Sequence, residues 1–505
     1  MHPTEYAALT PGKPALIYPA RGFMMDYATL EAQSNQGAHL LRELGLKRGD
    51  VIAMLFGNGP EVFITSWAAQ RSGLYATSIS NRLSAPDVAY IIQDSGARLL
   101  IVADELADLA QAALAEVPNP PPAFLWNSRS TAMQSWQERA STMPRTPIAD
   151  ESAGTDMLYS SGTTGRPKGV KPALPEGPIG EGTPLTRMGT GLYRMGPDTI
   201  YLSTSPLYHA APLRWALVAH RLGGTVVVME KFDAAETLRL IEQYRITHGT
   251  FVPTHFVRLL KLPDEEREAR DVSSLVAVVH AAAPCPVPVK QAMIDWFGPV
   301  IHEYYAGTES CGITAIATDE WLAKPGTVGR AVLGKLHIMS EDGHELPPGE
   351  TGLVYFSDGP SFEYLNDPEK TAAAHNDRGW ATLGDIGHVD EDGYLFLTDR
   401  KSFMIISGGV NIYPQEIENA LVTHPKVLDA AVIGVPDDEM GERVLAIIQP
   451  VAEIAGDEAL AEELRTFARE RLGGVKAPRD FVFRAELPRE PTGKLMKRKL
   501  VEEYR

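Results

Sequence analysis

The sequence predicts an α/β protein with a large N-terminal domain and a small C-terminal α+β domain. Strand-like apolar runs alternate with helical patterns over most of the first three-fifths of the chain. Short strand signals between Gly and Pro turns cover residues 326–359, and a separate compact pattern of helices and strands follows Arg400. Alternating strands and helices are typical of parallel βαβ units. The 505 residues also exceed what one hydrophobic core holds, so several domains or subdomains are expected.

The first part of the chain has a clear order of predicted elements. Leucines from Leu30 to Leu44 recur at helical spacing, and Gly45 is typical of a helix end. Residues 127–154 are polar and weakly periodic, which indicates a surface connection. Residues 171–184 are rich in Pro and Gly, so we expect an exposed excursion there. Between these regions we predict strands over 51–56 and 98–102 and helices over 60–71 and 86–93.

The alternation of predicted strands and helices resumes in the middle of the chain. It is followed by a β-rich stretch and then by the pattern of the C-terminal α+β domain. The stretch 326–359 predicts a small β-barrel or another β-rich subdomain. Residues 388–397 indicate a hairpin that closes on Asp392-Gly393. Further strands are predicted over 225–229, 249–252, 275–280, 427–434, 444–451 and 481–487, and further helices over 234–244, 255–262, 289–297, 414–422 and 459–472.

Bulk composition argues against several classes of function. A formal net charge of −18 opposes binding to nucleic acid, whose phosphates attract a basic surface, and docking on anionic membranes. No stretch reaches the ~18 apolar residues of a membrane helix, so an integral membrane protein is not expected. The start of the chain lacks the basic and apolar segments of a signal peptide. Cys285 and Cys311 form neither a disulfide framework nor a metal-ligand spacing, which favours a reducing, cytoplasmic location.

The stretch from Tyr159 to Val170 contains the first candidate site, and it reads Tyr-Ser-Ser-Gly-Thr-Thr-Gly-Arg-Pro-Lys-Gly-Val. Glycines let a backbone approach a ligand closely and present N–H donors, while hydroxyls and cations add further donors and positive charge. Such a loop suits a polyphosphate, although it lacks the Walker A spacing, and a flexible surface loop is the alternative. The candidate ligand-binding residues are Ser160, Ser161, Gly162, Thr163, Thr164, Gly165, Arg166 and Lys168.

Three more motifs follow this loop in order. They are Tyr304-Tyr-Ala-Gly-Thr-Glu309, Asp399-Arg-Lys-Ser-Phe-Met-Ile-Ile-Ser-Gly-Gly409 and Pro491-Thr-Gly-Lys494. The four motifs resemble those of the AMP-forming, or adenylate-forming, superfamily and in particular its acyl- and aryl-CoA synthetase branch. The resemblance covers nearly the whole chain. It implies Rossmann-like α/β subdomains and a small β-barrel subdomain in residues 1–399, followed by a mobile α+β domain in residues 400–505.

The resemblance also implies roles for individual residues. The hinge between the domains lies near Asp399–Ser402, where Ser402 replaces the Asp or Lys that is usual in the family. Lys494 bridges the substrate carboxylate and the α-phosphate as a mobile ammonium group. Thr308 bonds the α-phosphate, and Glu309 holds Mg²⁺ together with Thr164. Further implied contacts to ATP are Ala281, Ala282, Ala283, Glu303, Tyr304, Tyr305, Ala306, Gly307, Asp385 and Arg400, and those to coenzyme A are Ser407, Gly408 and Gly409.

The acid substrate is constrained only in part. Tyr208-His209 aligns with the position where amino-acid-activating relatives carry an acidic residue, and a histidine offers no lasting negative charge near neutral pH. We therefore count His209 among the catalytic candidates, with a packed core histidine as the alternative. A fatty, aryl or alicyclic acid is favoured over an amino acid, and a bulky or medium-length acid is preferred. Trp215, Val257 and His280 are the residues expected at the far end of the acid pocket.

Together these features predict an ATP-dependent carboxylic acid–CoA ligase. The reaction would proceed through an acyl-adenylate to acyl-CoA, AMP and pyrophosphate, with Mg²⁺ and coenzyme A as the other cofactors. A stand-alone adenylation enzyme that loads the pantetheine of a carrier protein is the second interpretation, and an inactive homologue that binds ATP or acyl groups is the third. The expected partner is a small-molecule acid, and a homodimer is one option for the oligomeric state.

Overall fold

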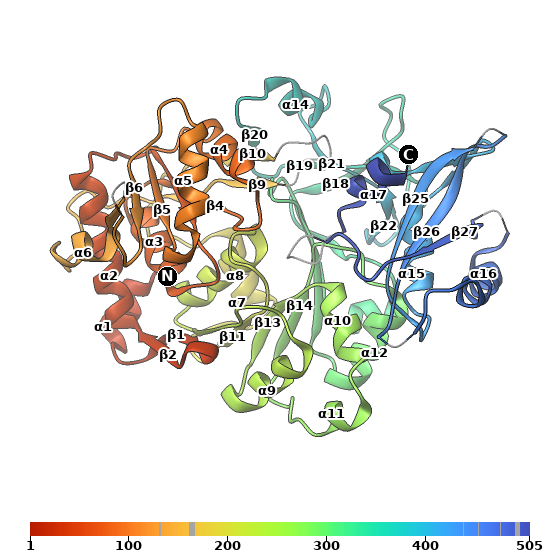
Figure 1. The fold of residues 1–505 in the computed structure, drawn as a ribbon, viewed down its shortest axis with the longest axis horizontal. Coiled ribbons are helices and arrows are strands. Elements are labelled where there is room, and N and C mark those ends of the chain that lie inside the picture. Colours follow the sequence, from red (N-terminus) through yellow and green to blue (C-terminus); the bar gives the residue numbers. More distant parts are fainter. Residues whose placement is uncertain are drawn as a thin grey trace.

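The computed structural model describes residues 1–130, 133–160, 167–437, 439–452, 454–474, 476–489 and 495–504. Figure 1 shows an N-terminal α/β layer, a second α/β layer beside it, a small β subdomain, and a C-terminal unit on one side. The arrangement confirms the predicted α/β class. Within the described ranges, no helix combines the length and the apolar character that a membrane span requires.

The first α/β layer is built on a six-stranded parallel sheet in the order β7-β6-β5-β3-β4-β8. Every residue of β3, β4 and β5 is buried, as expected for parallel strands covered on both faces. Its strands are β3 (Val51–Leu55), β4 (Tyr75–Ile79), β5 (Leu99–Val102), β6 (Ala123–Leu125), β7 (Gln134–Ser135) and β8 (Thr155–Asp156), and its helices are α2 (Tyr27–Glu43), α3 (Pro60–Arg71), α4 (Ala85–Asp94), α5 (Ala107–Glu116) and α6 (Trp136–Ser141).

The second layer is a nine-stranded sheet in the order β17-β16-β15-β14-β13-β11-β12-β1-β2. Its central strands run parallel, and β16 turns antiparallel beside β15. The strands are β1 (Pro14–Tyr18), β2 (Phe23–Asp26), β11 (Ile200–Ser203), β12 (Thr225–Val228), β13 (His248–Phe251), β14 (Ala277–His280), β15 (Ile301–Tyr305), β16 (Ile313–Ile316) and β17 (Arg330–Leu333). The helices are α1 (Pro3–Leu9), α7 (Pro184–Gly191), α8 (Ala210–Arg221), α9 (Ala234–Tyr244), α10 (Pro253–Leu260), α11 (Asp264–Glu268), α12 (Val287–Phe297) and α13 (Thr318–Ala323).

The β-rich subdomain consists of two antiparallel sheets that share one core. Val170 and Phe362 of the smaller sheet pack with Ile338, Val354 and Phe356 of the larger one. The sheets are β20-β10-β9 and β18-β19-β21-β22. Their elements are β9 (Leu158–Ser160), β10 (Lys168–Pro172), β18 (Lys335–Met339), β19 (Gly352–Ser357), β20 (Phe362–Tyr364), β21 (Ala381–Val389) and β22 (Leu395–Arg400), with α14 (Pro368–Ala373) beside them.

The predicted hairpin at Asp392-Gly393 is confirmed, because β21 and β22 pair on either side of it. Gly393 adopts a φ of 83°, a left-handed conformation that glycine accepts without steric cost. The participation of β9 and β10 in this subdomain was not predicted. Residues 171–172 belong to β10, so the expected excursion begins two residues later than predicted.

The C-terminal unit carries its own core, in which β25 and β26 form a long antiparallel hairpin. Both strands extend beyond the predicted ranges, because pairing continues from Gly434 to the turn before Gly441. The last strand is shorter than predicted, although Leu487 beyond it is buried. The elements are β23 (Ile405–Ser407), β24 (Val410–Ile412), α15 (Pro414–Leu421), β25 (Val427–Asp437), β26 (Gly441–Pro450), α16 (Glu458–Leu472), β27 (Asp480–Phe483) and α17 (Lys497–Tyr504).

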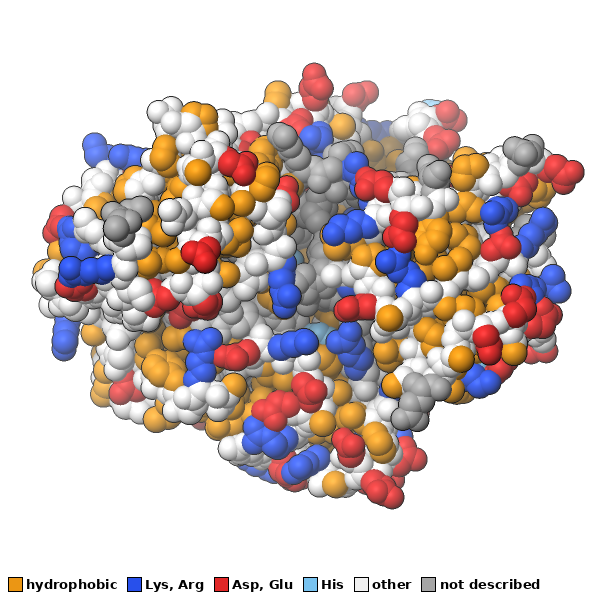
Figure 2. Space-filling model, in the orientation of Figure 1, with side chains coloured by type: hydrophobic (Ala, Val, Ile, Leu, Met, Phe, Trp, Pro, Cys, Tyr) orange, Lys and Arg blue, Asp and Glu red, His pale blue; other side chains and the backbone are white. Residues whose placement is uncertain are grey.

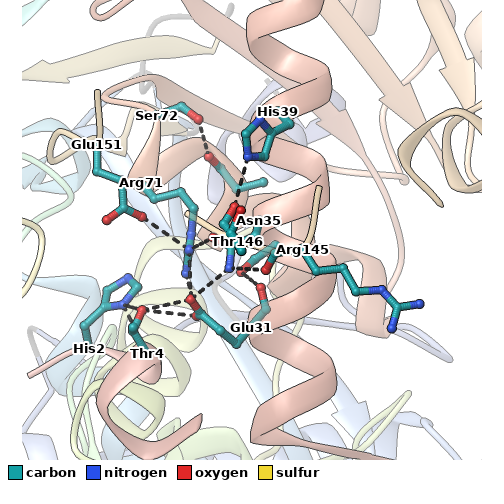
Figure 3. Close-up of polar contacts among 12 residues, drawn as sticks. His2, Thr4, Glu31, Asn35, His39, Arg71, Ser72, Arg145, Thr146 and Glu151 are labelled. Atoms are coloured by element: carbon teal, nitrogen blue, oxygen red, sulfur yellow. Dashed lines mark hydrogen bonds and ion pairs between the residues drawn. The ribbon is translucent and has the colours of Figure 1, made fainter. Parts of the chain in front are cut away.

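A buried polar network joins the start of the chain to α2 and α3 (Figure 3). The fully buried guanidinium of Arg71 donates to both carboxylate oxygens of Glu31, at 3.0 and 2.6 Å, and to Glu151 at 3.3 Å. The hydroxyl of Thr4 donates to Glu31 as well. Asn35 donates to the backbone carbonyl of Arg145 at 2.9 Å. These bonds anchor residues 145–151 on the helices, so part of the segment predicted as a polar surface connection is fixed in place.

The same segment also contains structure that its weak periodicity did not reveal. Residues 134–141 form β7 and α6, and the side chain of Trp136 is only 1% exposed. Ser135 caps α6 by accepting a hydrogen bond from the backbone N–H of Glu138. A six-residue helix offers too few residues for a helical period to stand out.

Candidate active site

The site forms where β14 and β15 end. These strands are parallel neighbours, with His280 opposite Glu303, so the segments that follow them meet at one edge of the sheet. Residues 281–283 lie on one side of this edge and residues 304–309 on the other. Ala282 and Ser310 adopt φ values of 75° and 56°, which cost a non-glycine residue roughly 1–2 kcal/mol. Strained backbone of this kind concentrates at functional sites.

A connected set of side chains places Tyr305 at this edge. The hydroxyl of Tyr305 donates to Asp385 at 2.6 Å, and Nε of Arg400 donates to the other oxygen of the same carboxylate at 3.0 Å. Asp385 and Arg400 are register partners in β21 and β22. Burial and then the Asp385 charge raise the pKa of Tyr305 well above its usual value, so the hydroxyl stays protonated and remains a donor. The ring of Tyr305 is therefore held by a fixed carboxylate.

Glu309 is held by a residue that sequence reasoning missed. The hydroxyl of Tyr364 in β20 donates to Glu309 at 2.8 Å, and the ammonium of Lys168 lies 5.1 Å from the centre of the Tyr364 ring. Burial and then the neighbouring Lys370 lower the pKa of Lys168. The ammonium would thus gain from an anionic ligand placed between the two lysines. Tyr364 lies in no motif, so the sequence carried no signal for it.

Thr308 also has a neighbour that the sequence did not predict. Arg214 of α8 donates to the backbone carbonyl of Thr308 at 3.4 Å and to the hydroxyl of Ser310 at 3.1 Å. Its guanidinium also forms a 2.7 Å ion pair with Asp156. Arg214 therefore ties the first turns of α8 to the loop after β15, which brings His209, the N-cap residue of α8, to the same region.

Glu303, which the resemblance implies as a contact to ATP, forms a buried ion pair. The residue is 5% exposed, and its carboxylate forms a 2.6 Å ion pair with Lys290 of α12, which is completely buried. Burial raises the pKa of Glu303, and the Lys290 charge opposes that effect. The pair braces β15 against α12. A direct role of Glu303 in nucleotide binding remains a prediction.

The three residues expected at the far end of the acid pocket do not lie together. Trp215 packs in the core between the sheet and α8, with Ala281 and Tyr304. Val257 packs in the core on the opposite face of the sheet, and the ring of His280 contacts Phe256 there. The grouping of Trp215 with Val257 and His280 was therefore wrong. The physical reason is that His280 and Ala281 are adjacent in an extended segment, whose side chains alternate between faces.

Comparison with known families decides the identity of this arrangement. The family model described as AMP-binding enzyme matches residues 4–362, and the model described as AMP-binding enzyme C-terminal domain matches residues 416–494. The first match alone covers more than half of the chain.

The chain belongs to the AMP-binding enzyme family.

Individual relatives agree with this assignment. The long-chain-fatty-acid–CoA ligase FadD13 of Mycobacterium tuberculosis is 33% identical over 509 residues, which cover 99% of this chain and 97% of the relative. The fatty acid–[acyl-carrier-protein] ligase ScoC of Streptomyces coeruleorubidus is 31% identical over 513 residues, covering 99% and 95%. The crystal structure of the anthranilate CoA ligase AuaEII with anthranoyl-AMP superposes with a TM-score of 0.87 at 25% identity, covering 100% of this chain and 96% of that one. The resemblance inferred from the four motifs is confirmed.

Two of the motifs of this AMP-binding enzyme fall partly or wholly outside the described residues. Ser160 and Lys168 are register partners in β9 and β10, so the two ends of the phosphate loop lie side by side. The residues outside the described ranges are Ser161, Gly162, Thr163, Thr164, Gly165, Arg166 and the segment 490–494 with Lys494. Their roles remain predictions.

The third motif connects the large body of the enzyme to its C-terminal unit. Asp399 at the end of β22 accepts a 2.9 Å hydrogen bond from the backbone N–H of Gln415 at the start of α15. Gly408 and Gly409 have φ values of 57° and 78° and form the turn between β23 and β24. Val410 in this hairpin is 45% exposed, so the turn faces solvent in this arrangement. Figure 2 shows a hollow between the body and the C-terminal unit, with Lys and Arg side chains along its rim.

Proposed function

We propose that this AMP-binding enzyme is an ATP-dependent carboxylic acid–CoA ligase. The acid carboxylate would attack the α-phosphorus of ATP to form an acyl-adenylate and pyrophosphate, and the thiol of coenzyme A would then displace AMP. One observation carries the proposal. The Tyr305–Asp385–Arg400 set and the Glu309–Tyr364–Lys168 set lie around the single edge where β14 and β15 end. This edge offers both a carboxylate and cations to one nucleotide.

The residues present fit ATP. Asp385 already accepts bonds from Tyr305 and Arg400, and a carboxylate has lone pairs to spare for ribose hydroxyls. Adenine would stack on the fixed ring of Tyr305, beside the small residues 281–283. The triphosphate would lie toward Lys168, where its negative charge would offset the repulsion between Lys168 and Lys370.

The donor set of Glu309 and Thr164 fits Mg²⁺, which prefers carboxylate and hydroxyl oxygens together with phosphate and water. When bound, the ion would neutralise charge on the phosphates. The acid and ATP are both anions, so the protein must reduce their repulsion and hold them in line. In our proposal Thr308 bonds the α-phosphate and Lys494 bridges it to the acid. These contacts accelerate the step because they strengthen as the adenylate forms.

The second half-reaction uses the C-terminal unit. We propose residues 1–399 and 400–505 as the two domains, with rotation about Asp399–Ser402 between the half-reactions. The Ser407-Gly408-Gly409 segment, in which the two glycines are exposed and Ser407 is buried, would then line the pantetheine path, because two glycines leave room for a slender chain near the backbone. The bond from Gln415 to Asp399 would have to break during such a rotation. The two free cysteines fit a reducing cytoplasm, which we also propose as the location.

The test is an assay of pyrophosphate, AMP and thioester with ATP, Mg²⁺, a panel of acids, and either coenzyme A or a pantetheinylated carrier protein. Acyl-CoA formation supports the ligase, whereas turnover with the carrier alone would support the second interpretation. Glu309→Gln should lower pyrophosphate release by about 100-fold or more. Glu363→Gln is the matched control, because Glu363 is 59% exposed and lies next to Tyr364. ATP binding without pyrophosphate release from any acid would overturn the proposal.

A further inference from the structure

The turn that follows β15 places Glu309 against its own backbone. The backbone N–H of Ser310 donates to the carbonyl of Gly307 at 3.2 Å and closes the turn. Oε1 of Glu309 accepts the bond from Tyr364, while Oε2 lies 2.5 Å from the point where a Cβ on Gly307 would stand. The absence of a side chain at Gly307 therefore lets the carboxylate pack on the turn. The positions of Glu309 and of its neighbour Thr308 thus depend on the shape of this Gly307–Ser310 turn.

The Gly307–Ser310 turn needs support from outside. Ser310 adopts a left-handed φ of 56°, which costs energy for a residue with a Cβ and persists only where the surroundings hold it. Arg214 supplies such a hold, because its Nη1 donates to the Thr308 carbonyl at 3.4 Å and to the Ser310 hydroxyl at 3.1 Å. The Ser310 hydroxyl in turn donates to the same carbonyl at 3.4 Å. One guanidinium therefore binds two acceptors of a single turn.

The guanidinium is itself fixed by a carboxylate from the other α/β layer. Nε and Nη2 of Arg214, in α8, donate to Oδ2 of Asp156, in β8, at 3.0 and 2.7 Å. The two side chains are only 18% and 11% exposed, so removing either one would leave the charge of the other uncompensated. Asp156 lies two residues before β9, which ends at Ser160, where the phosphate loop begins. The ion pair therefore joins the strand that enters the phosphate loop to the Gly307–Ser310 turn.

The charge of Arg214 also acts on the carboxylate proposed to hold Mg²⁺. Burial lowers the pKa of Arg214, but the charges of Asp156 and Glu309 raise it overall, so the side chain stays a cation. A guanidinium presents its donors in a rigid planar fork, which suits simultaneous bonds to Asp156 and to the turn. The compact ammonium of a lysine has no such fork. Arginine is therefore the residue type that this position requires.

We propose that Arg214 is a positioning residue: held by Asp156, it fixes the Gly307–Ser310 turn so that the turn meets the α-phosphate and Mg²⁺ in register with the phosphate loop. This inference rests on the ligase function proposed above. Without the guanidinium the turn is free to relax. A shift of about 1 Å in groups that contact the reacting atoms costs roughly 100-fold in rate. Arg214 therefore acts through Thr308 and Glu309 and has no contact with substrate in this proposal.

The test removes the donors of Arg214 and keeps most of its apolar stem. Arg214→Met should lower kcat for pyrophosphate release by about 10- to 100-fold. A second readout needs no turnover: the Kd for ATP, measured by calorimetry with Mg²⁺ and with EDTA. The gain in affinity that Mg²⁺ confers should be about tenfold smaller in the variant, whereas the Kd in EDTA should stay within about twofold, because the bond between Tyr305 and Asp385 is untouched. Arg214→Lys should lose less than Arg214→Met, because its ammonium keeps a charge beside Asp156.

Arg71→Met is the matched control, since it also removes a buried guanidinium from a carboxylate, in the network between α2 and α3. It should lose stability but keep its kcat and its response to Mg²⁺ within about twofold of the wild type, because distant sites act independently. If Arg214→Met folds poorly, as judged by its circular dichroism, Arg214→Lys replaces it in both measurements. A lower kcat and a weaker response to Mg²⁺ than in the wild type are then expected.

The possible results separate the two proposals. A folded Arg214 variant with the kcat and the Mg²⁺ response of the wild type would refute the positioning role. Equal losses in Arg71→Met would refute it as well, because both would then follow from lower stability. A wild type that binds ATP but releases no pyrophosphate with any acid would refute the ligase, whereas the calorimetric comparison would still decide the role of Arg214.

Discussion

The substitution Asp385→Asn tests the nucleotide side of the site most directly. The native carboxylate accepts one bond from Tyr305 at 2.6 Å and one from Arg400 at 3.0 Å. An amide of the same shape keeps one acceptor oxygen, but its NH₂ group must face one of these two donors. One charge-assisted bond is therefore lost. Such a bond contributes about 1.5–3 kcal/mol, which corresponds to a loss of roughly 10- to 150-fold.

The loss should appear in the kinetic parameters for ATP. We expect the KM for ATP to rise, or kcat/KM for ATP to fall, by that factor when pyrophosphate release is measured at saturating acid, while the KM for the acid changes little. Asp390→Asn is the matched control, since Asp390 follows the same strand, β21, and pairs with Lys324 at 2.6 Å away from the site. An Asp385→Asn enzyme whose ATP parameters stay within about twofold of the wild type would refute the assignment.

The remaining predictions concern the C-terminal lysine, a buried ion pair and a buried acid. Lys494→Ala should abolish most adenylation yet retain thioester formation from a preformed acyl-adenylate, and equal loss of both half-reactions in stopped assays would contradict the proposed role. Arg71→Met should lower the free energy of unfolding by about 3–5 kcal/mol, because it leaves the carboxylates of the buried network without their cation. Arg98→Met removes a half-exposed ion pair and should lower the free energy of unfolding by less than about 1 kcal/mol when both variants are unfolded in urea. Similar losses of stability in the two variants would contradict this prediction. Burial raises the pKa of Glu61 from 4.5 to about 7, so its ionisation destabilises the fold as pH rises through that window. At pH 8, Glu61→Gln should therefore have a higher melting temperature than the wild type, by the equivalent of about 3 kcal/mol. The melting temperatures of the two proteins, measured against pH, should converge near pH 4.5. A difference that stays constant with pH would refute the prediction.

Local patterns in the sequence were sufficient to predict many elements of the α/β layers. The predicted ranges 60–71 and 234–244 coincide with α3 and α9, because a long amphipathic or buried period is visible within a single element. The hairpin around Asp392-Gly393 was recognisable because its turn requires glycine at a positive φ. Short elements such as α6 were not predicted, since they contain too few residues for a helical period to be detected.

The sequence carried no comparable signal for contacts between elements that are far apart along the chain. Tyr305 and Asp385 are 80 residues apart, and Tyr364 and Glu309 are 55 apart, yet each pair shares a hydrogen bond. Arg214 and Lys290 also gained their roles only when α8 and α12 docked on the sheet. The sequence indicated Glu309 through its motif and Asp385 through the family resemblance, but it did not indicate the hydrogen bonds that orient them.

The sequence by itself determined the family and the class of reaction, because the residues that indicate both lie in short contiguous motifs. Only the tertiary structure decided which side chains share a face of the sheet. It separated Val257 and His280 from Trp215, and it packed Tyr304 of β15 against Trp215 of α8. The reason is physical: a strand fixes the alternation of its own side chains, but the helix that covers each face is chosen by packing across the whole layer.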